Sequence, residues 1–132
     1  MRNDRTENLT LIADDDLFIH KVLKEILKSF TQFDEVIDGA NVLAKYKEIL
    51  PDIVFLDIHM PNVDGLQLIK DIKEFDPEAY IVMVTADSKL ENVQSAIKDG
   101  AAGFIVKPFD KQTVIKSFGR CPAIIETVNI PA

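Results

Sequence analysis

Carboxylate side chains stand at two places in the sequence where an apolar run ends. Asp14, Asp15 and Asp16 follow the run Leu9–Ala13, and Asp57 follows a second run that is apolar at every position. Carboxylate oxygens are hard ligands of the kind that Mg²⁺ takes, usually one or two of them together with water. If the two runs are neighbouring strands, the acids meet at one edge of a sheet and form a candidate magnesium site. Asp16 lies nearest the following helix and suits its N-cap.

Two other polar residues stand at the ends of later apolar runs. Thr85 follows Tyr80–Val84, and Lys107 follows Gly103–Val106. Beside Asp57, a hydroxyl and an ammonium group could hold the oxygens of a phosphoryl group, while Mg²⁺ holds another. Each residue alone is weak evidence, because a threonine at a strand end is usually structural and a lysine is usually solvated. The set as a whole favours phosphoryl chemistry at Asp57.

Short apolar or β-branched runs alternate with amphipathic stretches, which predicts five strands and five helices in series. The expected strands are Leu9–Ala13, Phe33–Ile37, Ile53–Leu56, Tyr80–Val84 and Gly103–Val106. Runs that are apolar throughout are typical of strands buried on both faces of a parallel sheet. Serial βα units require right-handed crossovers, so the sheet carries helices on both faces. Functional residues of such sheets lie beyond the carboxyl ends of the strands.

The amphipathic stretches set the expected helices. They cover a first helix whose apolar face runs from Ile19 to Phe30, then Ala40–Leu50, Gly65–Phe75, Leu90–Asp99 and a short helix after residue 110. In the first helix, Ile19 and Leu23 belong to the apolar face, and His20 is assigned with the lysines to the polar face. Gly100 suits the C′ position of the fourth helix, and Asp110 the N-cap of the fifth.

Composition limits the kind of protein. The 132 residues fit one domain, and 47% hydrophobic with 28% charged residues excludes a disordered chain. With 15 basic and 22 acidic residues the formal net charge is -7, so we expect no nucleic-acid partner. No apolar run approaches the roughly 20 residues that span a bilayer, and Met1–Asn8 lacks a signal-peptide core, so a cytoplasmic location is expected. The single Cys121 allows no intramolecular disulfide and is interpreted as structurally incidental.

Four segments together resemble the receiver domain of bacterial response regulators, the class that includes the chemotaxis response regulator. These segments are Leu11–Asp16, Phe55–Gly65, Met83–Ala86 and Gly103–Phe109. The resemblance covers about residues 8–118. It implies a flavodoxin-like, doubly wound (βα)5 fold with a five-stranded parallel sheet in the order 2-1-3-4-5. The receiver domain would span residues 9–120, with a flexible tail at 1–8 and a tail of uncertain structure at 121–132.

The resemblance also implies a role for each residue of the set. Asp57 would be the phosphoacceptor, attacking a phosphohistidine on a partner. Asp15 and Asp57 would bind Mg²⁺ directly, Asp14 would act mostly through water, and the backbone carbonyl of His59 would complete the protein ligands. Lys107 would pair with the phosphoryl oxygens.

A second group of implied roles concerns switching and lifetime. Thr85 and Phe104 would move together as a two-state switch, although many family members carry tyrosine at the position of Phe104. The peptide between Lys107 and Pro108 would be cis. His59 and Asp87 stand at positions that the family uses to tune dephosphorylation, or else they are solvated loop residues.

The expected function is that of a signalling phosphoacceptor, which is not an enzyme beyond assisting its own phosphorylation and dephosphorylation. A sensor histidine kinase or a histidine phosphotransfer protein would donate the phosphoryl group, with Mg²⁺ as cofactor. The face formed by the fourth helix, fifth strand and fifth helix would signal to an unknown protein target. No membrane partner is expected, and the oligomeric state would be a monomer or weak dimer.

Three alternatives are open to test. A receiver-like binding module that is not phosphorylated usually lacks one of the acids or the lysine, and all are present here. A haloacid-dehalogenase-like phosphatase needs an acid two residues after its nucleophile, where this chain has His59. A flavodoxin-like cofactor carrier needs a Gly- and hydroxyl-rich loop after the first strand, where this chain has three acids.

The end of the chain departs most from the family pattern. Gly119 and Pro122 predict an early end of the fifth helix. The β-prone segment Ala123–Ile130 is interpreted as a disordered tail, an added edge strand or an interaction segment.

Overall fold

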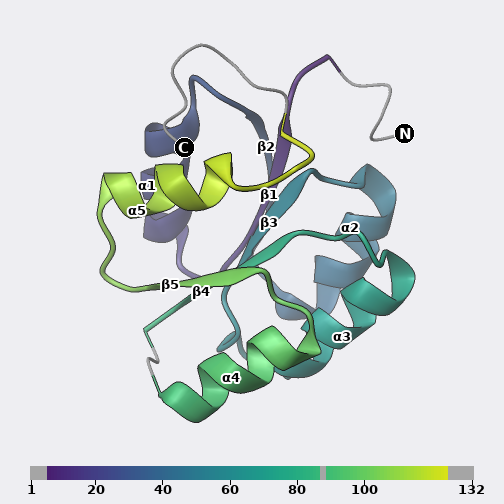
Figure 1. The fold of residues 1–132 in the computed structure, drawn as a ribbon. Helices are drawn as coiled ribbons and strands as arrows, with labels where there is room; N and C mark the ends of the chain where they lie inside the picture. The colour runs from purple at the N-terminus through teal and green to yellow at the C-terminus, as the bar shows by residue number, and fades with distance from the viewer. Residues whose placement is uncertain (1–5, 87–88, 125–132) are drawn as a thin grey trace.

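A single parallel sheet forms the centre of the computed structural model, which describes residues 6–86 and 89–124. Within these residues the strands pair in the order β2-β1-β3-β4-β5, and every pair is parallel (Figure 1). The strands are β1 (Leu9–Ala13), β2 (Gln32–Val36), β3 (Ile53–Leu56), β4 (Ile81–Thr85) and β5 (Gly103–Val106). The predicted fold class and strand order are therefore confirmed.

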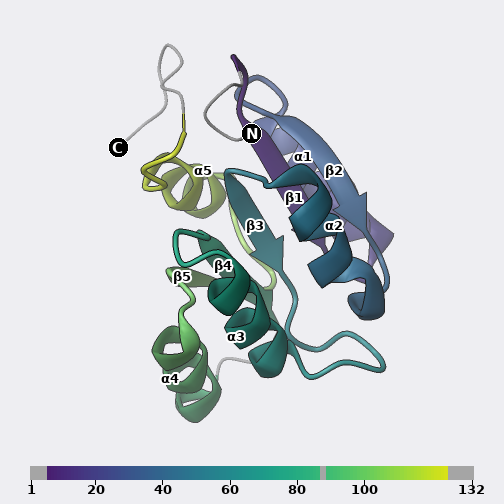
Figure 2. The ribbon, with the colours of Figure 1, turned by 90° about the vertical axis from the view of Figure 1, so that its right-hand side faces the viewer.

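Helices cover both faces of this sheet. They are α1 (Leu17–Leu27), α2 (Val42–Ile49), α3 (Gly65–Phe75), α4 (Leu90–Asp99) and α5 (Lys111–Gly119), with a 3-10 turn, η2 (Gly39–Asn41), before α2. Helices α1 and α5 lie on one face, and α2, α3 and α4 lie on the other, as the two views show (Figures 1 and 2). The arrangement is the doubly wound one that serial right-handed βα units produce.

The sheet separates two apolar cores, and β1 contributes to both. Leu11 packs with Tyr46 and the other side chains of α2, α3 and α4. The next residue, Ile12, points to the opposite face and packs with Leu23 of α1 and Phe118 of α5. Because successive strand residues face opposite sides, a strand buried on both faces must be apolar at every position. This explains the uninterrupted apolar runs in the sequence.

The predicted ends of several helices are confirmed by their hydrogen bonds. The Asp16 side chain caps α1 by accepting a hydrogen bond from the Phe18 amide at 2.9 Å. Asp110 caps α5 by accepting one from the Thr113 amide at 2.8 Å. Gly100 ends α4 with φ of 120°, a backbone conformation that favours glycine.

Three predicted boundaries are off by one or two residues. The strand predicted at Phe33–Ile37 begins at Gln32, whose amide donates to the Asn8 carbonyl at 2.8 Å and so extends the ladder. The strand predicted at Tyr80–Val84 is Ile81–Thr85. The second helix starts at Val42 instead of Ala40, because Asp38 accepts from the Ala40 amide and caps a 3-10 turn first.

Two assignments of the sequence analysis are wrong about burial. His20 was expected on the polar face of the first helix, yet it is only 2% exposed. It stands three residues before Leu23 and seven before Leu27, so helical periodicity brings it onto the buried face. Cys121 is not incidental: it packs in the α1–α5 core, and its Sγ donates to the Asp52 carbonyl at 3.2 Å.

The segments around both ends of the described chain also pack against the domain. Asn8 is buried, and its side-chain amide donates to the Phe30 carbonyl at 2.9 Å. The proposed tail boundaries at 1–8 and 121–132 remain predictions, and most of the β-prone segment near the C-terminus lies outside the described residues. In the part of the chain that is described, no helix is long and apolar enough to cross a membrane.

Candidate functional site

An acid cluster lies at the carboxyl ends of β1 and β3. Asp57 follows β3, and its amide donates to the Ala13 carbonyl at 2.9 Å, which holds the two strand ends side by side. One oxygen from each of Asp14, Asp15 and Asp57 lies within 4.8 Å of the others. Asp14 and Asp57 are buried and Asp15 is exposed. The three acids predicted to meet therefore do so.

Both oxygens of the Asp57 carboxylate have a hydrogen-bond partner. Oδ1 accepts from the His59 amide at 2.8 Å, and Oδ2 accepts from Lys107 Nζ at 3.1 Å. The first bond comes from the loop after β3 and the second from the end of β5. These two contacts fix the orientation of the Asp57 carboxylate. Asp57 is 6% exposed, so a small part of it is accessible from solvent.

The two oxygens of the Asp14 carboxylate have different partners. Oδ1 accepts from the Asp16 amide at 2.9 Å. Oδ2 is buried and forms an ion pair with Lys107 Nζ at 2.9 Å. Burial raises the pKa of Asp14, and Lys107 offsets this only in part. The buried Asp14 carboxylate thus adds negative charge to the cluster that one lysine does not fully offset.

Lys107 joins the two buried acids. Burial lowers the pKa of Lys107, but its contacts with Asp14 and Asp57 outweigh burial, so the pKa is raised and the ammonium stays charged. The Lys107 amide donates to the Thr85 carbonyl at 2.8 Å, which ties the end of β5 to the end of β4. The peptide from Lys107 to Pro108 is cis, as expected.

The remaining residues of the predicted set lie around this centre. Thr85 is fully buried as the last residue of β4, where its carbonyl holds the backbone of Lys107. Phe104 lies on β5 with its side chain 45% exposed, and His59 is exposed in the loop after β3. Asp87 lies outside the described residues.

The donor set fits Mg²⁺. Two or three carboxylate oxygens within a few ångströms, one of them buried without a hydrogen bond, match a hard cation that keeps several waters. Asp15 is exposed, which leaves the solvent side of the cluster open to those waters.

One contact at the site was missed by the sequence analysis. Nε2 of the buried His20 lies 2.7 Å from the backbone carbonyl oxygen of Asp14. Hydropathy alone assigns a histidine among lysines to the polar side of a helix. The spacing of His20 from Leu23 and Leu27 was the signal that would have found it.

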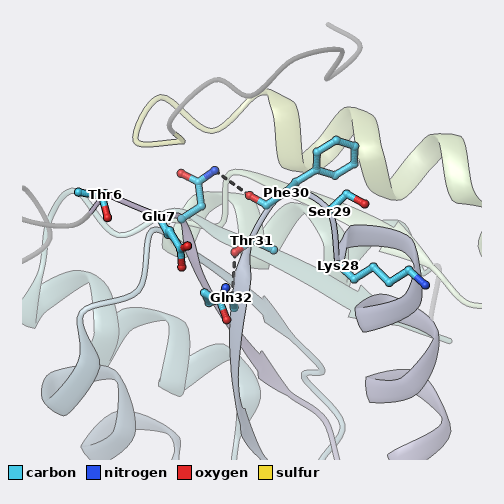
Figure 3. Close-up of a pocket in the computed structure, with 8 residues that line it drawn as sticks. Thr6, Glu7, Lys28, Ser29, Phe30, Thr31 and Gln32 are labelled. Atoms are coloured by element: carbon cyan, nitrogen blue, oxygen red, sulfur yellow. Dashed lines mark hydrogen bonds between the residues drawn. The ribbon is translucent and has the colours of Figure 1, made fainter.

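A small hollow elsewhere on the domain lacks these features. It has a volume of about 180 Å³ and lies between the segment before β1 and the turn from α1 into β2 (Figure 3). It is thus at the amino ends of the strands, whereas parallel sheets of this kind carry functional residues at the carboxyl ends. Its lining residues are Thr6, Glu7, Asn8, Lys28, Ser29, Phe30, Thr31 and Gln32.

An acid cluster and a lysine thus lie at the carboxyl edge of a parallel sheet with the strand order 2-1-3-4-5, where doubly wound folds carry their functional residues. Residues 10–118 match the response regulator receiver domain family, and the chain belongs to this family.

Within the family, the similarity is to the CheY type of response regulator. The chain is 42% identical to the chemotaxis protein CheY of Halobacterium salinarum over 106 residues, which are 80% of this chain and 88% of that relative. The structure is similar to Vibrio cholerae CheY4, with a TM-score of 0.81, 26% identity and coverage of 88% and 99%. It is also similar to CheY in a CheX–CheY–BeF3–Mg²⁺ complex from Borrelia burgdorferi, with a TM-score of 0.80, 38% identity and coverage of 84% and 86%.

Proposed function

We propose that Asp57 accepts a phosphoryl group from a phosphohistidine and that the chain then signals to a protein partner. The observation that carries this proposal is the contact of the Asp57 carboxylate with Lys107 at 3.1 Å inside an acid cluster. A carboxylate oxygen of Asp57 attacks phosphorus, the bond from phosphorus to the histidine nitrogen breaks, and an acyl phosphate remains. Phosphoryl transfer of this kind depends on alignment and on positive charge around the phosphoryl oxygens.

The residues around Asp57 would supply that charge. The Lys107 ammonium pairs with one phosphoryl oxygen, and the buried Thr85 hydroxyl donates to another. Asp14, Asp15 and Asp57, with the backbone carbonyl of His59, would hold Mg²⁺, which neutralises the remaining charge when bound. The Borrelia burgdorferi relative crystallised with BeF3 and Mg²⁺, which supports the same use of this site here.

The output surface would be the face of α4, β5 and α5. Phosphorylation draws the Thr85 hydroxyl toward the phosphoryl group, and the half-exposed Phe104 moves inward with it. Such a pair is a two-state element, because the phosphoryl group makes contacts in one state that it lacks in the other. His59 and Asp87 would set the lifetime of the signal by their access to the acyl phosphate.

The proposed donor is a sensor histidine kinase or a histidine phosphotransfer protein, and the readout is contact with a protein target. The relative from Borrelia burgdorferi was crystallised with CheX, which supports a protein partner for this chain. A cytoplasmic location and a monomeric or weakly dimeric state are the predictions that accompany this assignment.

Mass spectrometry after incubation with acetyl phosphate and Mg²⁺ tests the proposal. We expect one phosphoryl adduct on the wild type, its loss in Asp57→Ala, and its retention in Asp71→Ala, which removes an acid from the outer side of α3. The adduct should disappear on mild alkaline treatment, as acyl phosphates do. An equal adduct on Asp57→Ala would contradict the proposal, as would no adduct with acetyl phosphate or a cognate phosphohistidine donor.

An assay with a generic phosphomonoester distinguishes a phosphoacceptor from a phosphatase. A haloacid-dehalogenase-like phosphatase would turn over a generic phosphomonoester repeatedly. A phosphoacceptor takes up one phosphoryl group on Asp57 and cannot react again until this acyl phosphate is hydrolysed. Sustained release of phosphate from the phosphomonoester would favour the phosphatase.

A further inference from the structure

His20 is a buried polar residue of α1 that contacts the loop carrying the acids. It is 2% exposed, and its Nε2 lies 2.7 Å from the backbone carbonyl oxygen of Asp14. A carbonyl oxygen can only accept, so Nε2 carries the hydrogen and donates it. The donor of this bond thus comes from outside the acid cluster.

The Asp14 carbonyl needs a donor from outside the sheet. The last residue of β1 in register with both neighbouring strands is Ala13, which pairs with Val36 and Leu56. The next carbonyl therefore lies past both ladders, although Asp14 is buried at 2% exposure. A buried carbonyl without a donor destabilises the conformation that buries it. His20 supplies to the Asp14 carbonyl the hydrogen-bond donor that a neighbouring strand would otherwise supply.

The other side of the imidazole ring is held by the edge strand. Nδ1 lies 3.0 Å from Glu35 Oε1, and Lys24 Nζ lies 3.1 Å from the same oxygen. Glu35 belongs to β2, whereas His20 and Lys24 belong to α1. The ring therefore has a contact at each nitrogen, and these two contacts fix its orientation.

The bond to His20 acts on both acids of the loop. The carbonyl of Asp14 and the Cα of Asp15 belong to one planar peptide unit. Fixing the direction of this carbonyl therefore fixes the plane from which the Asp15 side chain leaves the backbone. The amide of Asp14 is also held, since it donates to the Val36 carbonyl at 3.2 Å. The peptide units on both sides of the Asp14 Cα are therefore each held by a hydrogen bond.

We propose that His20, oriented by Glu35, is a positioning residue that presets Asp14 and Asp15 for a divalent cation. This inference rests on the proposed Mg²⁺ site. Without the His20 donor the peptide between the two acids can rotate, and a cation must then order it on binding. Removal of a residue that orients a metal ligand through a hydrogen bond commonly weakens metal affinity tenfold or more.

The test is calorimetric titration of the whole chain with Mg²⁺. His20→Leu keeps much of the side-chain volume and removes the donor, so the Mg²⁺ Kd should rise about tenfold. His20→Gln keeps an N–H donor at a similar reach, so its Kd should stay within about threefold of wild type. Rescue by Gln separates hydrogen bonding to the carbonyl from simple filling of space.

A matched control separates positioning from general loss of stability. Leu27→Ala removes a fully buried side chain from the same face of α1, about two turns further along. It should lower the free energy of unfolding, measured by urea denaturation, and leave the Mg²⁺ Kd unchanged. If His20→Leu also leaves the Kd at the wild-type value, the inference is overturned while the Mg²⁺ site stands.

Two further variants cover the other outcomes. If His20→Leu does not fold, Glu35→Ala decides, because Glu35 is at the surface; it should weaken Mg²⁺ binding about threefold, and an unchanged Kd would overturn the inference. Asp15→Asn tests the site itself and should lose most of the affinity. Absence of Mg²⁺ binding by the wild type would overturn both the proposed function and the role of His20.

Discussion

Lys107 contacts two carboxylates at once, at 2.9 Å from Asp14 and 3.1 Å from Asp57. Asp15 adds a third carboxylate to this cluster, so the carboxyl edge of the sheet carries an excess of negative charge there. Burial raises the pKa of Asp14, the contact with Lys107 offsets this only in part, and the charge of Asp57 adds to the rise. We expect this excess of negative charge to attract a divalent cation.

Replacement of Asp14 by Asn should stabilise the metal-free protein at pH 7. A raised pKa means that the folded state disfavours the charged carboxylate, and a tenfold change in an acid dissociation constant corresponds to about 1.4 kcal/mol. We therefore expect Asp14→Asn to increase the free energy of unfolding. Urea denaturation of both proteins in the presence of a chelator measures the difference.

The pH dependence of this difference checks its cause. The folded-state pKa of Asp14 lies above the ordinary value of 3.8, so the wild type gains relative stability as pH falls through the folded-state pKa toward 3.8. The advantage of Asp14→Asn should consequently shrink to nothing below pH 3.8. An advantage that is constant with pH would show that charge is not its origin.

The acids of the site were predictable from the sequence, but the contact of His20 with the Asp14 carbonyl was not. Asp14 and Asp57 are evident because each ends an apolar run, and parallel strands bring their carboxyl ends to one edge. The role of His20 depends on which carbonyl lies past the last ladder, which is a property of the register. Hydropathy treats histidine as polar and gives no signal for a buried donor.

Among the elements, the loop between β3 and α3 is fixed by a close backbone approach at Gly65. A Cβ on Gly65 would lie 2.3 Å from the Cα of Ile58 and 2.4 Å from its carbonyl oxygen. Ile58 stands between Asp57 and His59, so this contact sets the path of the loop that carries two residues of the site. These are backbone atoms, which cannot move aside for a Cβ as the end of a flexible side chain can.

Gly65→Ala should therefore destabilise the fold by about 1–3 kcal/mol and displace the loop. Gly103→Ala is the matched control, because a Cβ there meets nothing within 4 Å, and it should be neutral or slightly stabilising. Thermal unfolding followed by circular dichroism compares the two variants. Equal losses of stability would contradict the assigned close contact.

Element boundaries were predictable where a local hydrogen bond sets them. Asp16 and Asp110 are N-caps that a sequence pattern can identify, and both make the expected bonds. The start of α2 was missed because Asp38 caps a 3-10 turn, and its side-chain bond to the Ala40 amide looks the same in sequence as a helix cap. The start of β2 was missed because Gln32 is recruited by pairing with the segment before β1.

At the scale of the whole molecule, a cation at the acid cluster should stabilise folding by mass action. A ligand that binds only the folded state adds RT ln(1 + [L]/Kd), which is about 1.4 kcal/mol at ten times Kd. We expect Mg²⁺ to raise the Tm of the wild type progressively with concentration. Differential scanning fluorimetry over a range of MgCl2 concentrations measures this shift.

NaCl at matched ionic strength is the control for screening of the net charge of -7. Asp15→Asn should remove most of the Mg²⁺ shift and keep the response to NaCl. A shift of the same size in Asp15→Asn would place the cation elsewhere on the acidic surface.

The strand order also has a consequence for how the chain reaches its folded state. The three acids come from the ends of β1 and β3, within the first half of the sequence. Lys107 comes from the end of β5, which pairs with β4 and is the last strand of the sheet among the described residues. On a growing chain the mutual repulsion of the acids exists before their counter-charge has been synthesised. Addition of the last strand supplies that counter-charge, so closing the sheet and balancing the site are a single event.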